Sequence, residues 1–147
     1  MSYSLGLLKV MGIKIASTLL ETNKHEPEQK LWQAVLVNAF EDVLCNASDK
    51  KSAIAKWQAN EWFKNSNEKD FESICYMSGF DPEYVLQRYN LAIKENKIKF
   101  NQRQKAWGEY YKVLIKFHAA DTRELKRELK LALEKVRQKV MLTKFEE

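Results

Sequence analysis

The 147-residue sequence contains few of the residues that break helices. It has only four Gly and two Pro, whereas Lys, Glu, Leu and Ala are abundant. Such a composition favours helix throughout a chain. The glycines are also isolated from one another, which excludes the Gly-rich loop whose backbone amides hold a nucleotide. We therefore expect an all-α protein without a nucleotide-binding loop.

Cysteine and histidine are equally scarce, with two of each. Cys45 and Cys75 fall within apolar helical patterns, as is typical of buried free thiols in a reducing cytoplasm, and their spacing is not that of a metal site. Neither His25 nor His118 has Cys, Asp or Glu at ligand spacing. We expect neither a metal nor any other cofactor.

Catalytic and membrane-spanning patterns are missing as well. The adjacent Glu41 and Asp42 point to different sides of a helix, and no Ser, His and acid are aligned as a nucleophile and its base. The apolar residues 1–22 are interrupted by Lys9 and Lys14, so they lack the run of roughly 18–20 residues that spans a bilayer. They also lack the pattern of a signal peptide. These absences favour a cytoplasmic binding protein over an enzyme or a membrane protein.

Residues 70–93 predict two short helices separated by a single glycine. The first helix has an apolar repeat at helical spacing, formed by Phe71, Ile74 and Cys75. Gly79 is suited to end that helix in the left-handed conformation, because it has no Cβ. Asp81 can cap a second helix whose first turn begins with Pro82. Two helices joined by a short turn that contains Gly form a helix-turn-helix unit.

These residues resemble the DNA-binding segment of helix-turn-helix regulators, including region 4 of sigma factors. In that family a small residue precedes the turn glycine by four positions and a buried aliphatic residue follows it by six, and the corresponding residues here are Cys75, Gly79 and Val85. A longer pattern over residues 31–93 resembles small helical regulators of alphaproteobacterial phages and gene-transfer agents. One position departs from the family: Arg88 stands where an aliphatic residue is usual, so we expect Tyr89 to pack in its place.

The resemblance implies that the second helix enters the major groove of duplex DNA, where each base pair presents a distinct edge. The side chains expected to point outward and contact the DNA are Glu83, Tyr84, Gln87, Arg88 and Asn90. Of these, Gln87 or Asn90 could pair with adenine and Arg88 with guanine. The cations that follow are expected to contact phosphates, and they are Lys94, Lys97, Lys99, Arg103 and Lys105.

The net charge of +5 is unevenly distributed along the chain. Residues 1–93 contain ten Lys or Arg and twelve Asp or Glu, whereas residues 94–147 contain fifteen and eight. This asymmetry places a surface for a polyanion in the second half of the chain. A Lys-rich helix can equally be a solvated face, and both interpretations stay open.

The length of 147 residues predicts a single compact domain, residues 1–147. The periodicity predicts about six or seven helices within it. An apolar stripe runs through residues 5–20, and further helices are expected over 28–46, 50–64, 102–118 and 121–144. The last of these is long and basic, with a narrow apolar side suited to packing on another helix. Within residues 50–64, Trp57 and Trp62 fit core packing better than base stacking.

These patterns together predict a sequence-specific DNA-binding transcription regulator of phage or gene-transfer-agent type. One alternative is an activator or antiterminator that acts mainly through protein contacts with RNA polymerase. Another is a DNA-binding subunit resembling a small terminase, with an oligomerising helix. Double-stranded DNA is the expected partner. RNA polymerase and a second copy of the chain are further candidate partners, and no membrane is expected.

Overall fold

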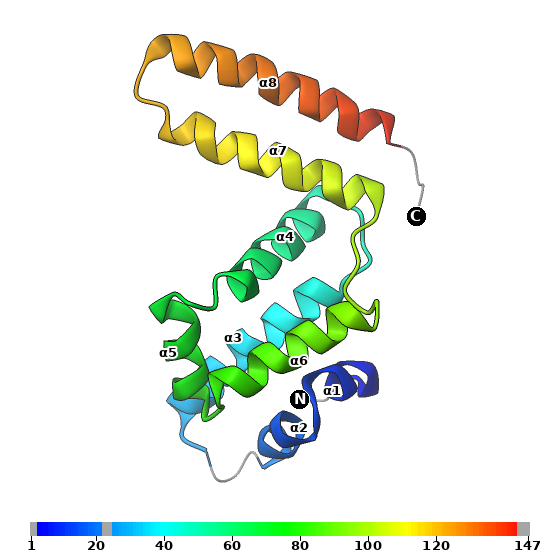
Figure 1. The fold of residues 1–147 in the computed structure, drawn as a ribbon, viewed down its shortest axis with the longest axis vertical. Coiled ribbons are helices and arrows are strands. Elements are labelled where there is room, and N and C mark those ends of the chain that lie inside the picture. Colours follow the sequence, from blue (N-terminus) through cyan, green and yellow to red (C-terminus); the bar gives the residue numbers. More distant parts are fainter. Residues whose placement is uncertain (1–2, 22–24, 144–147) are drawn as a thin grey trace. The chain divides into compact units, whose positions relative to one another are not determined.

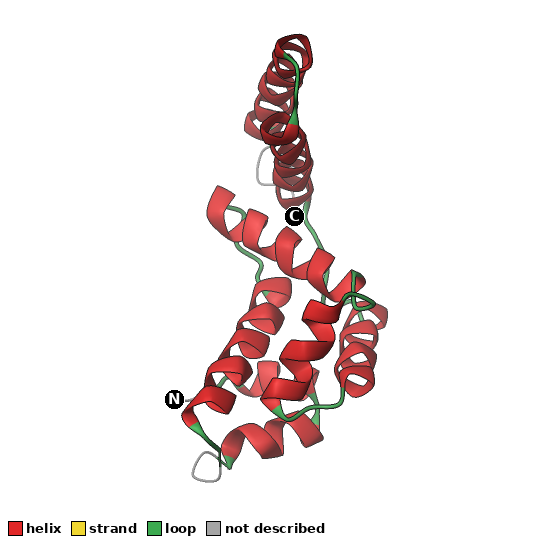
Figure 2. Ribbon diagram, turned by 90° about the vertical axis from the view of Figure 1, so that its left-hand side faces the viewer, coloured by secondary structure: helices red, strands yellow, loops and turns green. Residues whose placement is uncertain are grey.

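The computed structural model describes residues 3–21 and 25–143, and all regular structure within these ranges is helical (Figure 2). The helices are α1 (Leu5–Met11), α2 (Ile13–Leu20), α3 (Pro27–Leu44), α4 (Lys50–Lys64), α5 (Lys69–Ser78), α6 (Pro82–Lys94), α7 (Gln102–Ala119) and α8 (Arg123–Leu142). The expected all-α class is confirmed. None of the described helices is both long enough and apolar enough to cross a membrane.

The N-terminal apolar stripe forms two helices rather than the one that its periodicity suggests. Gly12 separates α1 from α2 and has a φ of +92°, which is open to glycine and strained for other residues. Ser4 begins α1 by accepting a hydrogen bond from the Leu7 amide at 3.2 Å. Leu7, Met11 and Ile15 are buried, so the inner sides of both short helices pack into the protein.

Contacts within the chain divide it into two compact units. The first unit comprises the chain up to Cys45 together with Gln58–Lys99, and the second comprises Asn46–Trp57 together with the chain from Phe100 onward. Because the division falls within α4, the start of this helix packs in the second unit and its end packs in the first.

Aromatic side chains form the centre of the first unit. The Phe63 ring from α4 lies 4.9 Å from Phe40 of α3 and stacks on Tyr89 of α6 at 4.5 Å, measured between ring centroids. Phe71 of α5 completes the group at 6.2 Å from Phe63. Trp62 packs against Phe71 and donates from Nε1 to the Asp70 carboxylate at 2.8 Å. Trp62 therefore packs in the protein, as the sequence analysis predicts.

The second unit contains α7 and α8 as an antiparallel pair (Figure 1). Its small apolar core contains Ala53 of α4, Ala106 and Trp107 of α7, and Val140 of α8. Helix α8 spans Arg123–Leu142 instead of residues 121–144, because Thr122 rather than Asp121 is its N-cap and accepts from the Leu125 amide at 3.1 Å. Lys144 lies outside the described residues.

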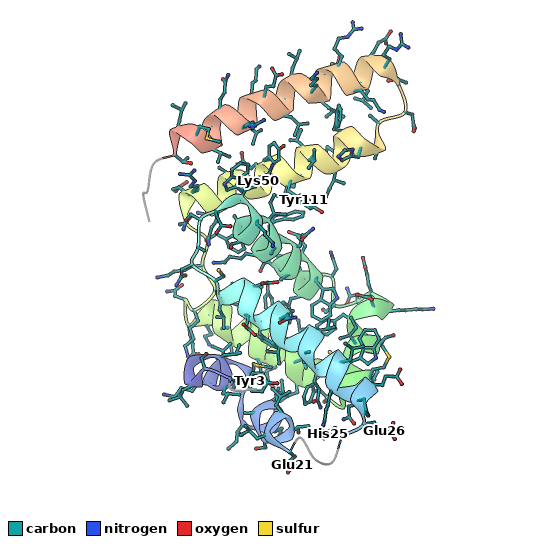
Figure 3. All side chains as sticks on the ribbon, turned by 180° about the vertical axis from the view of Figure 1, so that it is seen from behind. Tyr3, Glu21, His25, Glu26, Lys50 and Tyr111 are labelled. Carbon is teal, nitrogen blue, oxygen red and sulfur yellow. The ribbon has the colours of Figure 1, made fainter. Side chains whose placement is uncertain are left out.

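The first half of α7 packs against α4 and the residues just before it through polar and aromatic contacts. Asn101 and Gln104 form a capping box, and the side-chain Nδ2 of Asn101 donates to Ser48 Oγ at 2.8 Å. The buried Lys56 ammonium donates to Gln104 Oε1 at 3.2 Å. Tyr111, labelled with Lys50 in Figure 3, meets the Trp57 ring edge-on at 5.2 Å. Trp57, like Trp62, is therefore used in packing.

Candidate nucleic-acid interface

Three residues, Gly79 to Asp81, join α5 to α6. Gly79 has a left-handed backbone (φ 87°, ψ 22°), and its N–H donates to the Tyr76 carbonyl at 3.0 Å. Asp81 caps α6 by accepting from the Glu83 amide at 3.1 Å. Both local predictions, the glycine cap and the aspartate cap, are confirmed.

The turn is anchored from α3. Gln33 and Gln29 each donate from Nε2 to the Ser78 carbonyl, at 3.0 Å and 3.3 Å. These bonds satisfy an acceptor at the end of α5 that the helix itself leaves unpaired. A Cβ placed on Gly79 would lie 2.6 Å from the flexible end of Gln29, which can move, so the left-handed backbone is what favours glycine here. The direction in which α6 leaves the turn is therefore closely constrained.

Helix α6 has one buried side and one exposed side. Val85, Tyr89 and Ala92 are buried, and they recur at steps of four and three residues. The exposed residues that recur at the same steps are Glu83, Gln87, Asn90 and Lys94, which we call the α6 stripe. The stripe retains three of the five side chains expected to point outward, including both amides.

Arg88 and Tyr84 have other roles, which corrects the expectation that both point outward. The Arg88 guanidinium donates from Nε to the Val10 carbonyl at 3.1 Å and from Nη2 to the Lys9 carbonyl at 2.8 Å. These carbonyls belong to the last turn of α1, where the helix has no N–H donors of its own to bond them. Tyr84 is half-buried beside Gly12, and its ring lies 5.1 Å from the Lys14 ammonium. The pair thus holds the N-terminal helices on α6.

The family pattern has a buried aliphatic residue at the position that Arg88 occupies here. Tyr89, the next residue, packs into the core instead, as expected. Its ring is 2% exposed, and its hydroxyl donates to Asn60 Oδ1 at 2.5 Å. Burial, with a smaller effect of the Glu61 charge, raises the pKa of Tyr89 to about 12. The rotation of α6 about its own axis is therefore fixed from both sides, by Tyr89 in the core and by Arg88 on α1.

The five predicted phosphate contacts are divided between the two units. Lys94, Lys97 and Lys99 belong to the first unit and are exposed, and Lys97 lies 3.7 Å from the Glu95 carboxylate. Arg103 and Lys105 belong to the second unit, where Arg103 is half-buried and Lys105 is exposed on α7.

Charge follows the same division. The first unit contains ten Lys or Arg against twelve Asp or Glu, and the second contains fifteen against eight. No residue of α8 was predicted to belong to a site, although this helix carries much of the positive excess. Its exposed cations are Arg123, Lys126, Arg127, Lys130, Lys135, Arg137 and Lys139. Their spacing at three and four residues was the signal that could have identified them.

The Cys75 thiol of α5 is buried in the core. Burial raises the pKa of the Cys75 thiol to about 12, with Asp81 and Glu72 adding to the shift, so the thiol is protonated at neutral pH. Cys45 and Cys75 are both free. Over residues 3–21 and 25–143, no three His, Cys, Asp or Glu side chains come together as metal ligands.

Comparison with known proteins gives no match to a family model, to a curated protein or to a solved structure.

Proposed function

We propose that this protein is a sequence-specific, duplex-DNA-binding transcription regulator in which α5, its glycine turn and α6 act as a helix-turn-helix. The observation that supports this most directly is the α6 stripe. It combines exposed amide side chains with a helix whose direction and rotation are fixed. An α-helix fits the major groove, and fixed side chains are needed there because base edges are read by geometry.

Within the stripe, Gln87 and Asn90 are the residues that read bases. Each has an amide that can donate and accept at once, which matches the paired donor and acceptor of adenine in the major groove. Lys94, at the end of the stripe, and Lys97 and Lys99 beyond it contact phosphates, which position a protein without reading sequence.

Selection of bound duplexes from a random library, at moderate salt and with the full chain, tests this function. We expect a defined sequence motif. Gln87→Ala or Asn90→Ala should then lower affinity for that motif by about 5- to 150-fold, the range for one bidentate base contact. Asn38→Ala is the matched control, because Asn38 is an exposed amide on α3. Absence of a selected motif, or an equal effect of the control, would contradict the proposal.

A further inference from the structure

One side of α8 carries a row of cations that has no part in the DNA contacts proposed for the α6 stripe. At 100° per residue, five of its exposed cations fall within about 100° of the helix circumference. We call them the α8 basic face: Arg123, Lys126, Arg127, Lys130 and Arg137. The row extends over about 21 Å at 1.5 Å per residue. Glu134 is the acidic residue in the same arc.

These cations repel one another in the free protein. Arg123 is followed at three and four residues by Lys126 and Arg127, and both precede Lys130 by four and three residues. Like charges at these spacings destabilise a helix. In the described part of the chain, none of the five forms an ion pair that would offset this repulsion. A bound polyanion would remove the repulsion by neutralising the row.

The chemistry of the row favours the phosphate backbone of a duplex. Guanidinium groups form paired hydrogen bonds to phosphate, and three of the five cations are arginines. Proteins that hold single strands stack bases on aromatic rings, whereas α8 contains no Phe, Tyr or Trp. Duplex DNA carries a negative charge about every 1.7 Å of its axis, so a straight cationic row meets many phosphates along its length.

We propose that the α8 basic face binds the phosphate backbone of duplex DNA, independently of base sequence, as a contact separate from the α6 stripe. The choice of duplex DNA among polyanions rests on the proposed function, and the contact itself does not depend on α6. Its role is to supply affinity for any duplex, while α6 supplies the choice of sequence.

The test is binding of the full chain to a duplex of scrambled sequence, measured by fluorescence anisotropy over a range of salt concentrations. The variant combines Arg127→Gln, Lys130→Gln and Arg137→Gln. Each phosphate contact contributes about 0.9 to the slope of log affinity against log salt, so the slope should fall by about 2 to 3. Glu134→Gln should change binding in the opposite direction and tighten it.

A control with the same loss of charge combines Lys30→Gln, Lys64→Gln and Lys69→Gln, all exposed in the first unit. It should leave the slope nearly unchanged. The thermal midpoint of the α8 variant should be equal to or above that of the parent, because repulsion is relieved. That result would separate lost binding from lost folding.

The two proposals fail in different ways. If the α8 variant keeps the parental slope while Gln87→Ala loses the selected motif, the α8 proposal is overturned and the proposed function stands. If the slope falls while no motif can be selected, the α8 contact stands and sequence recognition by α6 is overturned. Equal affinity for polyglutamate and for duplex DNA, at matched charge, would overturn the assignment of the α8 basic face to a nucleic acid.

Discussion

Cys75 shows how one buried thiol makes stability depend on pH. Burial raises its pKa from an ordinary value of 9.0 to about 12, whereas in the unfolded chain the thiol titrates at the ordinary value. Above pH 9 the unfolded state therefore binds fewer protons than the folded state, and the free energy of unfolding falls as pH rises toward 12. Denaturant midpoints measured at intervals above pH 8 should show this decline.

Tyr89 adds to the same decline, because its pKa is raised from 10.0 to about 12. Cys75→Ala should therefore make the dependence between pH 9 and 12 shallower without abolishing it. If the free energy of unfolding of the variant fell with pH as steeply as that of the parent, the assigned burial of the Cys75 thiol would be contradicted.

Gly108 supplies a second test at a single position. It lies within α7, and a Cβ there would meet Trp57 Cδ1 at 2.9 Å, which requires the indole or the helix to shift. Gly108→Ala gains about 1 kcal/mol in helix propensity but overpacks a contact at a cost of about 1–3 kcal/mol. We expect a net loss of about 1 kcal/mol in the free energy of unfolding, measured by denaturant titration.

Gly6→Ala is the matched control for that experiment. Gly6 lies in α1, and a Cβ at this position has no atom within 4 Å. The substitution should raise stability by up to about 1 kcal/mol. Opposite signs at the two glycines would show that the contact with Trp57, rather than helix propensity, decides the outcome at Gly108.

At the scale of helices, periodicity and capping residues predicted most of the elements. The glycine turn, the cap at Asp81 and the buried side of α6 all follow from interactions within a few residues. The break at Gly12 was missed, because the apolar stripe continues across it and only the backbone conformation interrupts the helix.

Only part of the prediction for the outward side of α6 agrees with the structure. A sequence shows which residues share a side of a helix, but not which other helix covers that side. Gln87 and Asn90 remain exposed, whereas Arg88 and Tyr84 contact residues about seventy to eighty positions earlier in the chain. The α8 basic face was missed because the charge asymmetry is a property of residues 94–147 as a whole, whereas the placement of these cations on one side follows from their spacing of three and four residues.

Arg88 permits a direct test of how α1 is held on α6. Its guanidinium donates to two carbonyls at the end of α1, and charged hydrogen bonds contribute about 1.5–3 kcal/mol when well shielded. Because the side chain is partly exposed, we expect Arg88→Ala to lower the free energy of unfolding by about 1–2 kcal/mol. Amide hydrogen exchange should accelerate first in α1.

Gln87→Ala is the control on the same helix, because Gln87 is exposed and belongs to the α6 stripe. Its effect on stability should stay within about 0.5 kcal/mol, as for an ordinary surface substitution. The reverse order of effects would contradict the placement of Arg88 against α1 and restore it as a candidate base contact.

At the scale of the molecule, the two units have separate cores and opposite charge. The first has a large aromatic centre and a slight negative excess, and the second has a small core and a strong positive excess. Composition gave the total charge and the helical class, but it could not show that the chain from Asn46 to Trp57 packs with residues after Phe100. That pairing depends on contacts between segments about fifty residues apart, such as Lys56 with Gln104.

Because the two units have separate cores, we expect a core substitution in one unit to destabilise that unit and leave the other nearly unchanged. Val140 is fully buried in the second unit against Ala53 and Trp107, so Val140→Ala removes packing there and should cost about 2 kcal/mol. We expect faster amide exchange in α7 and α8, with little change in α3 and α5. Leu36→Ala, at a fully buried position in the first unit, should give the reverse pattern at a cost of about 2–5 kcal/mol. If either substitution accelerated exchange equally throughout the chain, the units would unfold as one, and the division of DNA contacts between them would lose its structural basis.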